Sequence, residues 1–261
     1  MREMINELIQ YRHLLFMLTW RDIKVRYKQS AMGFLWAIFM PMMIVCSGIL
    51  VKKGFSIVSG KPMVFAELAS VSVKSLPWAF FVGSIRFATN SLVGRSNLVT
   101  KIYFPREVLP LSSVLGNLFD FSIATTVLIL IFAIARIGVS IYLLWLPFLL
   151  ILLILFTSGL SMLLSCANLF FRDVKYIVEV ILTFGIFFTP VFYEAKMFGK
   201  WAPILLLNPI GSILEGINDV VVLHCQPDFF WLIYASCWAI IGFFVSWKIF
   251  DNLEPSFAEN I

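Results

Sequence analysis

The chain has 261 residues, of which 61% are hydrophobic and 13% are charged, and its formal net charge is +5. An ordinary soluble domain carries about 25% charged residues, so this composition excludes the soluble globular class and predicts an all-α integral membrane protein. A nucleic-acid partner is also disfavoured, because the basic residues are scattered along the flanks of apolar segments and form no single patch.

Residues 1–28 predict an interfacial helix at the start of the chain. The apolar residues of this segment recur at alternating steps of four and three: Met4, Leu8, Tyr11, Leu15 and Leu18. That spacing gives one apolar stripe on a helix, and the segment is otherwise basic. A basic amphipathic helix of this kind lies in the plane of the membrane, in contact with membrane lipid. Packing against another subunit is the alternative, and both interpretations place the segment on the cytoplasmic surface.

Six apolar runs follow, and about 20 such residues suffice to cross the hydrocarbon core of a bilayer. The predicted spans are residues 29–51, 75–94, 108–135, 142–168, 175–193 and 229–247. We therefore expect about six transmembrane helices in one domain over residues 29–251, after the interfacial helix and before a cytoplasmic tail at residues 252–261.

The orientation of these spans follows from the basic residues in their connections. An even number of spans places both termini on one side, and that side carries twelve lysines and arginines against seven on the other. Cytoplasmic connections are enriched in basic residues, so both termini are expected in the cytoplasm.

Two of the connections on the cytoplasmic side contain a pair of adjacent residues with opposite charge. The loop after the second span combines charges, aromatic residues and prolines: Lys101, Phe104, Pro105, Arg106, Glu107 and Pro110. Prolines restrict the backbone of the residues that precede them, so this loop is stiff on both sides of its Arg-Glu pair. A second charged pair, Arg172–Asp173, precedes the fifth span. On spacing alone, both connections are also explained as charged flanks that anchor helix ends.

Three ionisable residues lie within the apolar spans, and each costs at least about 2.5 kcal/mol at a helix centre. Arg86 and Asp120 belong to consecutive, antiparallel spans, so they are placed to pair with each other. Alternatively, Arg86 faces a conduit and contacts a polar or anionic substrate. Glu179 lies only about a turn inside the fifth span, where its carboxylate can reach the membrane surface.

Helix breakers follow the fifth span. Thr189-Pro190 interrupts the apolar run, and Asn208-Pro209 comes shortly afterwards. Broken helices at membrane depth are tolerated only where protein or a water-filled cavity covers the exposed backbone groups, which indicates a passage. Asn208 can cap a helix that has Pro209 in its first turn. The helix expected over residues 210–222 is too short to span, so we predict short re-entrant half-helices on the outer side.

This order of elements resembles the membrane subunit of ABC-2-type polysaccharide exporters, which move O-antigen, capsule or teichoic-acid chains. The resemblance is carried by Trp78 in the second span, the Lys101–Pro110 run, the Arg172–Asp173 pair and the proline-broken segments. It implies a homodimeric permease in the bacterial inner membrane that moves a lipid-linked glycan. It also implies that ATP and Mg are bound by two copies of a separate cytoplasmic ABC ATPase subunit, so that this chain is a transport subunit and not an enzyme.

The resemblance also assigns expected roles to individual residues. Residues that contact the ATPase would be Lys101, Phe104, Pro105, Arg106, Glu107, Arg172 and Asp173. Candidates for the wall of the conduit are Trp78, Arg86, Asp120, Phe188 and Tyr193. Candidates for an outer gate are Pro190, Asn208 and Pro209.

Catalytic chemistry has little support in the sequence. The two histidines, His13 and His224, are far apart and lack metal-ligand spacing, so no metal site is expected. No nucleophile motif is present. A membrane-embedded transferase of lipid-linked substrates stays open as an alternative, although it needs more surface charges than Arg172 and Asp173. An ABC-2 permease for a small lipid or drug is the other alternative, and the Lys101–Pro110 run argues against it by resemblance.

Overall fold

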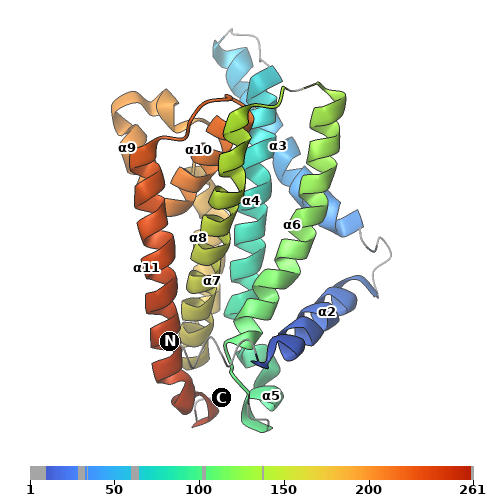
Figure 1. The fold of residues 1–261 in the computed structure, drawn as a ribbon, viewed down its shortest axis with the longest axis vertical. Helices are drawn as coiled ribbons and strands as arrows, with labels where there is room; N and C mark the ends of the chain where they lie inside the picture. The colour runs from blue at the N-terminus through green and yellow to red at the C-terminus, as the bar shows by residue number, and fades with distance from the viewer. Residues whose placement is uncertain are drawn as a thin grey trace.

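A computed structural model describes residues 10–28, 33, 35–59, 65–101, 104–136 and 138–259. The described residues form helices and their connections without any β-strand, which confirms the all-α class. Long helices run side by side, and the first helix of the described residues lies obliquely beside one end of them (Figure 1).

Ten α-helices are described: α2 (Arg12–Lys28), α3 (Leu35–Ser59), α4 (Phe65–Thr89), α5 (Ser96–Lys101), α6 (Val108–Ile134), α7 (Leu146–Phe170), α8 (Val174–Phe188), α9 (Ala202–Leu206), α10 (Pro209–Val221) and α11 (Phe229–Leu253). Short 3₁₀ segments connect or extend them: η1 (Val93–Arg95), η2 (Ile141–Trp145), η3 (Ala195–Trp201) and η4 (Glu254–Glu259). We call the end of the bundle with α5 and η4 the α5 end, and the opposite end the α10 end (Figure 1).

The predicted spans correspond to α3, α4, α6, α7, α8 and α11. Among the described residues, four segments are long and apolar enough to cross a membrane: Ala66–Thr89, Val108–Ile134, Ile141–Phe170 and Phe229–Phe257. The chain is therefore a multi-pass membrane protein. The helix α8 has 15 residues, or about 22 Å at 1.5 Å per residue, which is shorter than a hydrocarbon core of about 30 Å.

Several predicted helix boundaries are wrong. The fifth span was expected to reach residue 193, but α8 ends at Phe188 and Thr189 is extended, with φ −113° and ψ 137°. Thr189 precedes Pro190, and a proline disfavours helical geometry in the residue before it. The second span was expected to begin at residue 75, whereas α4 begins at Phe65 and contains Lys74, which was assigned to a loop because of its charge.

The core is built around α4, which packs against α3, α6, α7, α8 and α10. Side chains from α4, α7 and α10 fill its centre, including Val71, Ile85, Leu152 and Ile213. A second apolar cluster at the α5 end joins α5, α6, α7, α11 and η4. The segment predicted as a tail contributes to this cluster, because Phe257 of η4 is fully buried there.

The predicted interfacial helix lies only partly within the described residues, since Met4 and Leu8 fall outside them. The remainder forms α2, which packs obliquely against α6 (Figure 1). Ile23 and Tyr27 of α2 are buried against Phe119 and Ile123 of α6. The helix is therefore attached to the bundle by its own contacts, and its contact with lipid or with another subunit stays a prediction.

The pair formed by α7 and α11 depends on one glycine. A Cβ atom at Gly159 of α7 would lie 2.9 Å from the Cα atom of Phe243 in α11. That contact is with backbone, which cannot move aside as a flexible side chain can. The two helices therefore approach closely at a position where any other residue would separate them.

We expect Gly159→Ala to lower the thermal stability of the purified protein, by an amount typical of overpacking, about 1–3 kcal/mol. Gly242→Ala is the matched control, because Gly242 lies in α11 near the same contact and a Cβ there meets nothing within 4 Å. Thermal midpoints in one detergent would compare the two variants. Equal midpoints for both variants would contradict the close approach of α7 and α11.

Candidate functional site

Asp120, in the middle of α6, is bound by two residues of α2. Its carboxylate accepts hydrogen bonds from the guanidinium of Arg26 and the hydroxyl of Tyr27, both on α2. The predicted Arg86–Asp120 pair is therefore wrong. The prediction considered only the neighbouring span as a source of a partner, whereas the oblique path of α2 along α6 brings Arg26 to Asp120 instead.

Arg86 of α4 pairs with Glu179 of α8. The Nε atom donates to Oε2 at 2.9 Å, and Nη2 lies 2.7 Å from Oε1, so the contact is bidentate. The two side chains are 47% and 49% exposed. Glu179 thus links α8 to α4, and the pair faces an open space.

That space is a cavity of about 1020 Å³ at the α5 end, between α2, α4, α6 and α8. We call it the basic cleft. Its charged lining consists of five cations and two carboxylates: Arg21, Arg26, Arg86, Arg95, Lys175, Asp22 and Glu179. Of the conduit candidates, Arg86 lies in this lining.

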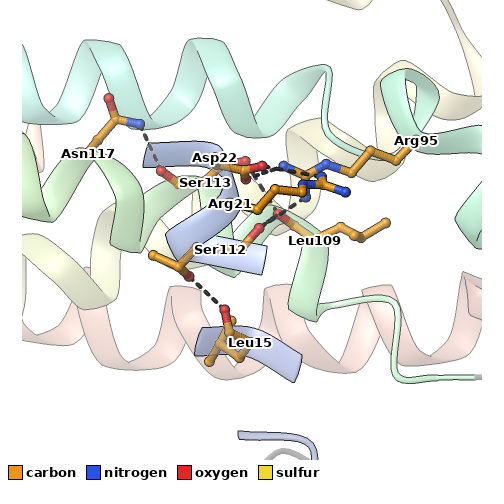
Figure 2. A network of polar contacts seen from close by, with 9 residues as sticks. Leu15, Arg21, Asp22, Arg95, Leu109, Ser112, Ser113 and Asn117 are labelled. Carbon is orange, nitrogen blue, oxygen red and sulfur yellow. Dashed lines mark hydrogen bonds and ion pairs between the residues drawn. The ribbon is translucent and has the colours of Figure 1, made fainter. Parts of the chain in front are cut away.

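One wall of the basic cleft is fixed by Asp22 of α2. Its two carboxylate oxygens accept from the guanidinium groups of Arg21 and Arg95 (Figure 2). Arg95 also donates to the hydroxyl of Ser112 in α6, at 3.1 Å. Asp22 therefore attaches α2 to the connection that follows α4.

At the α10 end, a fully buried lysine holds the chain after the proline break. The Nζ atom of Lys74 donates to the carbonyl oxygen of Tyr193 at 2.5 Å and lies 3.4 Å from Oε1 of Glu215. Glu215 of α10 also accepts from the backbone nitrogen of Ala195 at 2.8 Å. Lys74 and Glu215 together attach the outer connection to α4 and α10.

The outer gate candidates lie together. Asn208 caps α10 as predicted, because its Oδ1 accepts from the backbone nitrogen of Ile210 at 3.2 Å and Pro209 occupies the first turn. The Nδ2 atom of Asn208 donates to Oγ1 of Thr189 at 3.0 Å. Pro190 packs close to Gly211, where a Cβ would lie 3.0 Å from its Cδ atom. The start of α10 therefore closes onto the end of α8.

A second charged contact lies at the far end of α10. Lys196 of η3 lies 3.6 Å from Oδ1 of Asp219. Burial raises the pKa of the Asp219 carboxyl to about 6, and the negative charge of Asp219 raises the pKa of Lys196. The ion pair therefore weakens as the pH falls through 6, because Asp219 then takes up a proton.

The remaining conduit candidates have different surroundings. Trp78 is buried in the core, where a Cβ at Gly185 of α8 would meet its ring at 3.4 Å. Tyr193 donates its hydroxyl to the carbonyl oxygen of Phe187 at 2.8 Å. Phe188, in contrast, is 71% exposed. Of these three, Phe188 is the side chain that points away from the bundle.

The residues expected to contact an ATPase fall into two groups. Arg106 is committed to contacts within the chain: its backbone nitrogen donates to Oε1 of Glu254 at 3.1 Å, and its guanidinium donates to the carbonyl oxygens of Glu254 and Val99. Its neighbours Phe104, Pro105 and Glu107 are buried. Arg106 thus joins α5 to η4 at the α5 end.

The second group comprises Arg172 and Asp173, which are both exposed in the connection between α7 and α8. Asp173 precedes α8 without a capping bond from its side chain. The side chain of Lys101 lies outside the described residues. Within the described part of the chain, no three His, Cys, Asp or Glu side chains are placed to hold a metal ion.

Three members of these ion pairs, Arg26, Lys74 and Glu215, were not among the predicted site residues, and the partner predicted for Asp120 was wrong. Lys74 and Glu215 are 141 positions apart, and Arg26 and Asp120 are 94 apart. The available signal was the charge of each residue inside or beside an apolar helix, because such a charge needs a partner. The identity of the partner required the packing of the helices.

Charge pairing at Asp120 can be tested with a double-mutant cycle. Arg26→Met and Asp120→Asn are each expected to lower the thermal midpoint, because each change leaves a partly buried group without its partner. The double variant should lose less than the two single losses together, with a coupling of about 1–3 kcal/mol.

The matched comparison combines Arg86→Met with Asp120→Asn, whose side chains bind different partners. Their effects on the thermal midpoint should add. Additive effects for Arg26 and Asp120, with coupling between Arg86 and Asp120, would contradict the pairing that the structure describes.

Comparison with known proteins shows which family and which relatives the chain is similar to. The family described as ABC-2 type transporter matches residues 13–222. The O-antigen export system permease protein RfbA of Myxococcus xanthus is 29% identical over 265 residues, which cover 100% of both chains. Two proteins of the same name from Klebsiella pneumoniae are 30% and 27% identical over 254 and 253 residues, and each alignment covers 94% of both chains.

Proposed function

Because the chain belongs to the ABC-2 type transporter family, we propose that it is the permease subunit of an ATP-driven exporter of a lipid-linked, O-antigen-like polysaccharide. The observation that carries this proposal is similarity over 94–100% of the chain to three proteins named O-antigen export system permease. A polar polymer cannot cross hydrocarbon unaided, and a multi-helix membrane protein with proline-broken outer segments provides a route for it.

The functional unit that we propose is a homodimer with α8 at its centre. One side of α8 is apolar and exposed in the single chain: Tyr176, Ile177, Val180, Ile181, Phe184, Phe187 and Phe188. Glu179 of the same helix forms a half-exposed ion pair with Arg86 of α4, and a charged pair inside an apolar span requires water or protein around it. Both features support a position of α8 against a second copy or a water-filled conduit, where aromatic rings can contact the apolar faces of sugars.

Energy is supplied, in this proposal, by two copies of a separate ABC ATPase that bind ATP and Mg at the cytoplasmic α5 end. Arg172 and Asp173 are exposed, charged residues at that end, and they immediately precede α8 in the chain. Force applied there can move α8 as a rigid body. Arg106, which holds η4 in place, instead maintains the shape of the docking surface.

The orientation in the inner membrane has a direct test. In a variant without Cys46, Cys166, Cys225 and Cys237, single cysteines would be introduced at Asn97, near the α5 end, and at Lys200, near the α10 end. Both positions are exposed. A membrane-impermeant maleimide should label Lys200→Cys in cells with an intact inner membrane, and Asn97→Cys only after lysis. The opposite pattern would overturn the cytoplasmic placement of the termini.

Export itself is tested in cells that lack the chain. We expect surface polysaccharide to disappear and its lipid-linked form to accumulate inside, and the wild-type chain should restore both. Unchanged surface polysaccharide would overturn polymer export and favour a small lipid or drug as substrate. Loss of the lipid-linked form, with no accumulation, would favour a transferase.

Coupling is tested with Asp173→Ala, which should leave protein level and membrane insertion normal while surface polysaccharide falls about tenfold, within the usual range for coupling between two sites. ATPase activity of the purified complex would be measured in parallel. Asp251→Ala is the matched control, since Asp251 is also exposed and acidic at the α5 end but lies on α11. Normal export in the Asp173→Ala variant would leave Asp173 with no more than an anchoring role.

A further inference from the structure

A long apolar crevice lies at the α10 end of the bundle, beside the second half of α6 and the first turns of α7. Its volume is about 290 Å³, and its walls come from α4, α6, α7 and α10 and from the connections that follow α6 and α10. Ile129 and Val139, which line it, are 60% and 85% exposed, so it opens onto the surface of the bundle. We call it the apolar crevice.

The apolar crevice has the dimensions of a single hydrocarbon chain. Its lining on α6 runs from Phe121 to Ala133, or about 18 Å at 1.5 Å per residue. Half of the hydrocarbon core of a bilayer is about 15 Å thick, so the crevice extends from one surface of the membrane to roughly its middle. A helix of about 10 Å diameter would need several times the volume of the crevice over that length. An extended acyl chain fits where a helix of a second copy does not.

The polar groups of the lining lie mainly at one end. Its polar side chains are Thr125, Ser140 and His224. Ser140 and His224 belong to the two connections at the α10 end, and Nε2 of His224 would lie 3.9 Å from a Cβ at Gly138. Nδ1 of His224 is buried and has no hydrogen-bond partner among the described residues. An occupant therefore has its polar end at these connections and its apolar part along α6.

Arg136 adds a positive charge at the same end. It is exposed, lies two residues after the end of α6, and forms no ion pair within the residues that the structure describes. The carboxylates nearest in sequence to His224, those of Asp219 and Asp228, line a separate cavity of about 50 Å³ together with Lys196. The mouth of the apolar crevice thus combines a cation with an unpartnered imidazole nitrogen, which suits an anionic headgroup.

The depth of this mouth in the membrane is marked by aromatic residues. Tyr142 and Trp145 lie in η2, directly after Ser140. Such amphipathic rings are enriched at the level of the lipid headgroups. A cation at that level attracts anionic lipid.

We propose that the apolar crevice binds one acyl chain of an anionic phospholipid from the leaflet at the α10 end, with the phosphate group at Arg136. The bound chain lies against Pro77 of α4, which also lines the crevice. Pro77 lacks the N–H that would bind the carbonyl oxygen of Val73, so the lipid supports α4 where the helix is weakened. The site is independent of export, since neither a glycan nor an ATPase takes part.

The site can be tested by cross-linking, with the purified full-length permease in nanodiscs of phosphatidylcholine. The probe is a trace of phosphatidylglycerol that carries a diazirine in one acyl chain. Mass spectrometry should find cross-links on residues 121–133 and 143–150. A few per cent of unlabelled phosphatidylglycerol should suppress them about fivefold, because a single site is saturable. Cross-links at the exposed Ile241 of α11 should not change, because bulk lipid contacts are not saturable.

A change of size at the mouth tests whether the chain enters the apolar crevice. Ala133→Trp places a large ring in the lining and should lower the cross-linking yield about tenfold. Ala135→Trp is the matched control, because Ala135 is also exposed at the end of α6 but lies outside the lining. Thermal midpoints would identify folded variants. Equal labelling of residues 121–133 in the two variants would overturn the site, as would cross-links there that unlabelled phosphatidylglycerol does not suppress.

The headgroup contact is tested with the charge at Arg136. Arg136→Gln should lower labelling by the phosphatidylglycerol probe about fivefold, the effect of one cation beside an anionic lipid. Lys200→Gln, at an exposed lysine of η3 outside the lining, should label as the wild type does. The same probe with a choline headgroup should label the wild type about fivefold less. Equal labelling by both probes would overturn the binding of an anionic phospholipid, whatever the outcome for export.

Discussion

An ionisable side chain inside an apolar bundle must find a partner of opposite charge, and this constraint decides which helices lie next to each other here. Each of three pairs joins two helices that are not joined by a short connection: Arg26–Asp120 (α2 and α6), Arg86–Glu179 (α4 and α8) and Lys74–Glu215 (α4 and α10). For the two more buried pairs, Arg26–Asp120 and Lys74–Glu215, leaving one member alone is more costly than losing both. The pairs therefore specify an arrangement that apolar packing, which is less directional, does not specify alone.

Two of these pairs share α4, and this gives the central helix contacts with both ends of the molecule. Lys74 holds the outer connection, whereas Arg86 lies in the basic cleft, twelve residues further along the same helix or about 18 Å away. Pro77 lies between them within α4 and removes one backbone hydrogen bond from the helix. The helix can therefore bend between the contact with α10 and the contact with α8.

The fold class and the positions of the helix breaks in the outer segment were predictable from the sequence, because apolar runs, prolines and capping residues are local signals. Asn208 followed by Pro209 predicts a capped helix, and the cap is present. Pro190 likewise provides the signal that ends α8 at Phe188, two residues earlier, although the predicted span ran past it. The partner of Asp120 was not predictable in the same way, since Arg26 lies 94 positions away and reaches it only through the oblique path of α2.

Helix α8, which lies between the basic cleft and the outer gate residues, is held only lightly by the core. Only Val178 and Leu182 of α8 are buried, so polar contacts carry much of its attachment: Glu179 with Arg86 near one end, and Thr189 with Asn208 just past the other. Loss of the Arg86–Glu179 contact would release the first end of α8 and leave the second attached. The helix would then be free to turn about its α10 end, and the exposed Arg172–Asp173 connection would move with it. A partner that binds this exposed connection would thus act on a lightly packed helix.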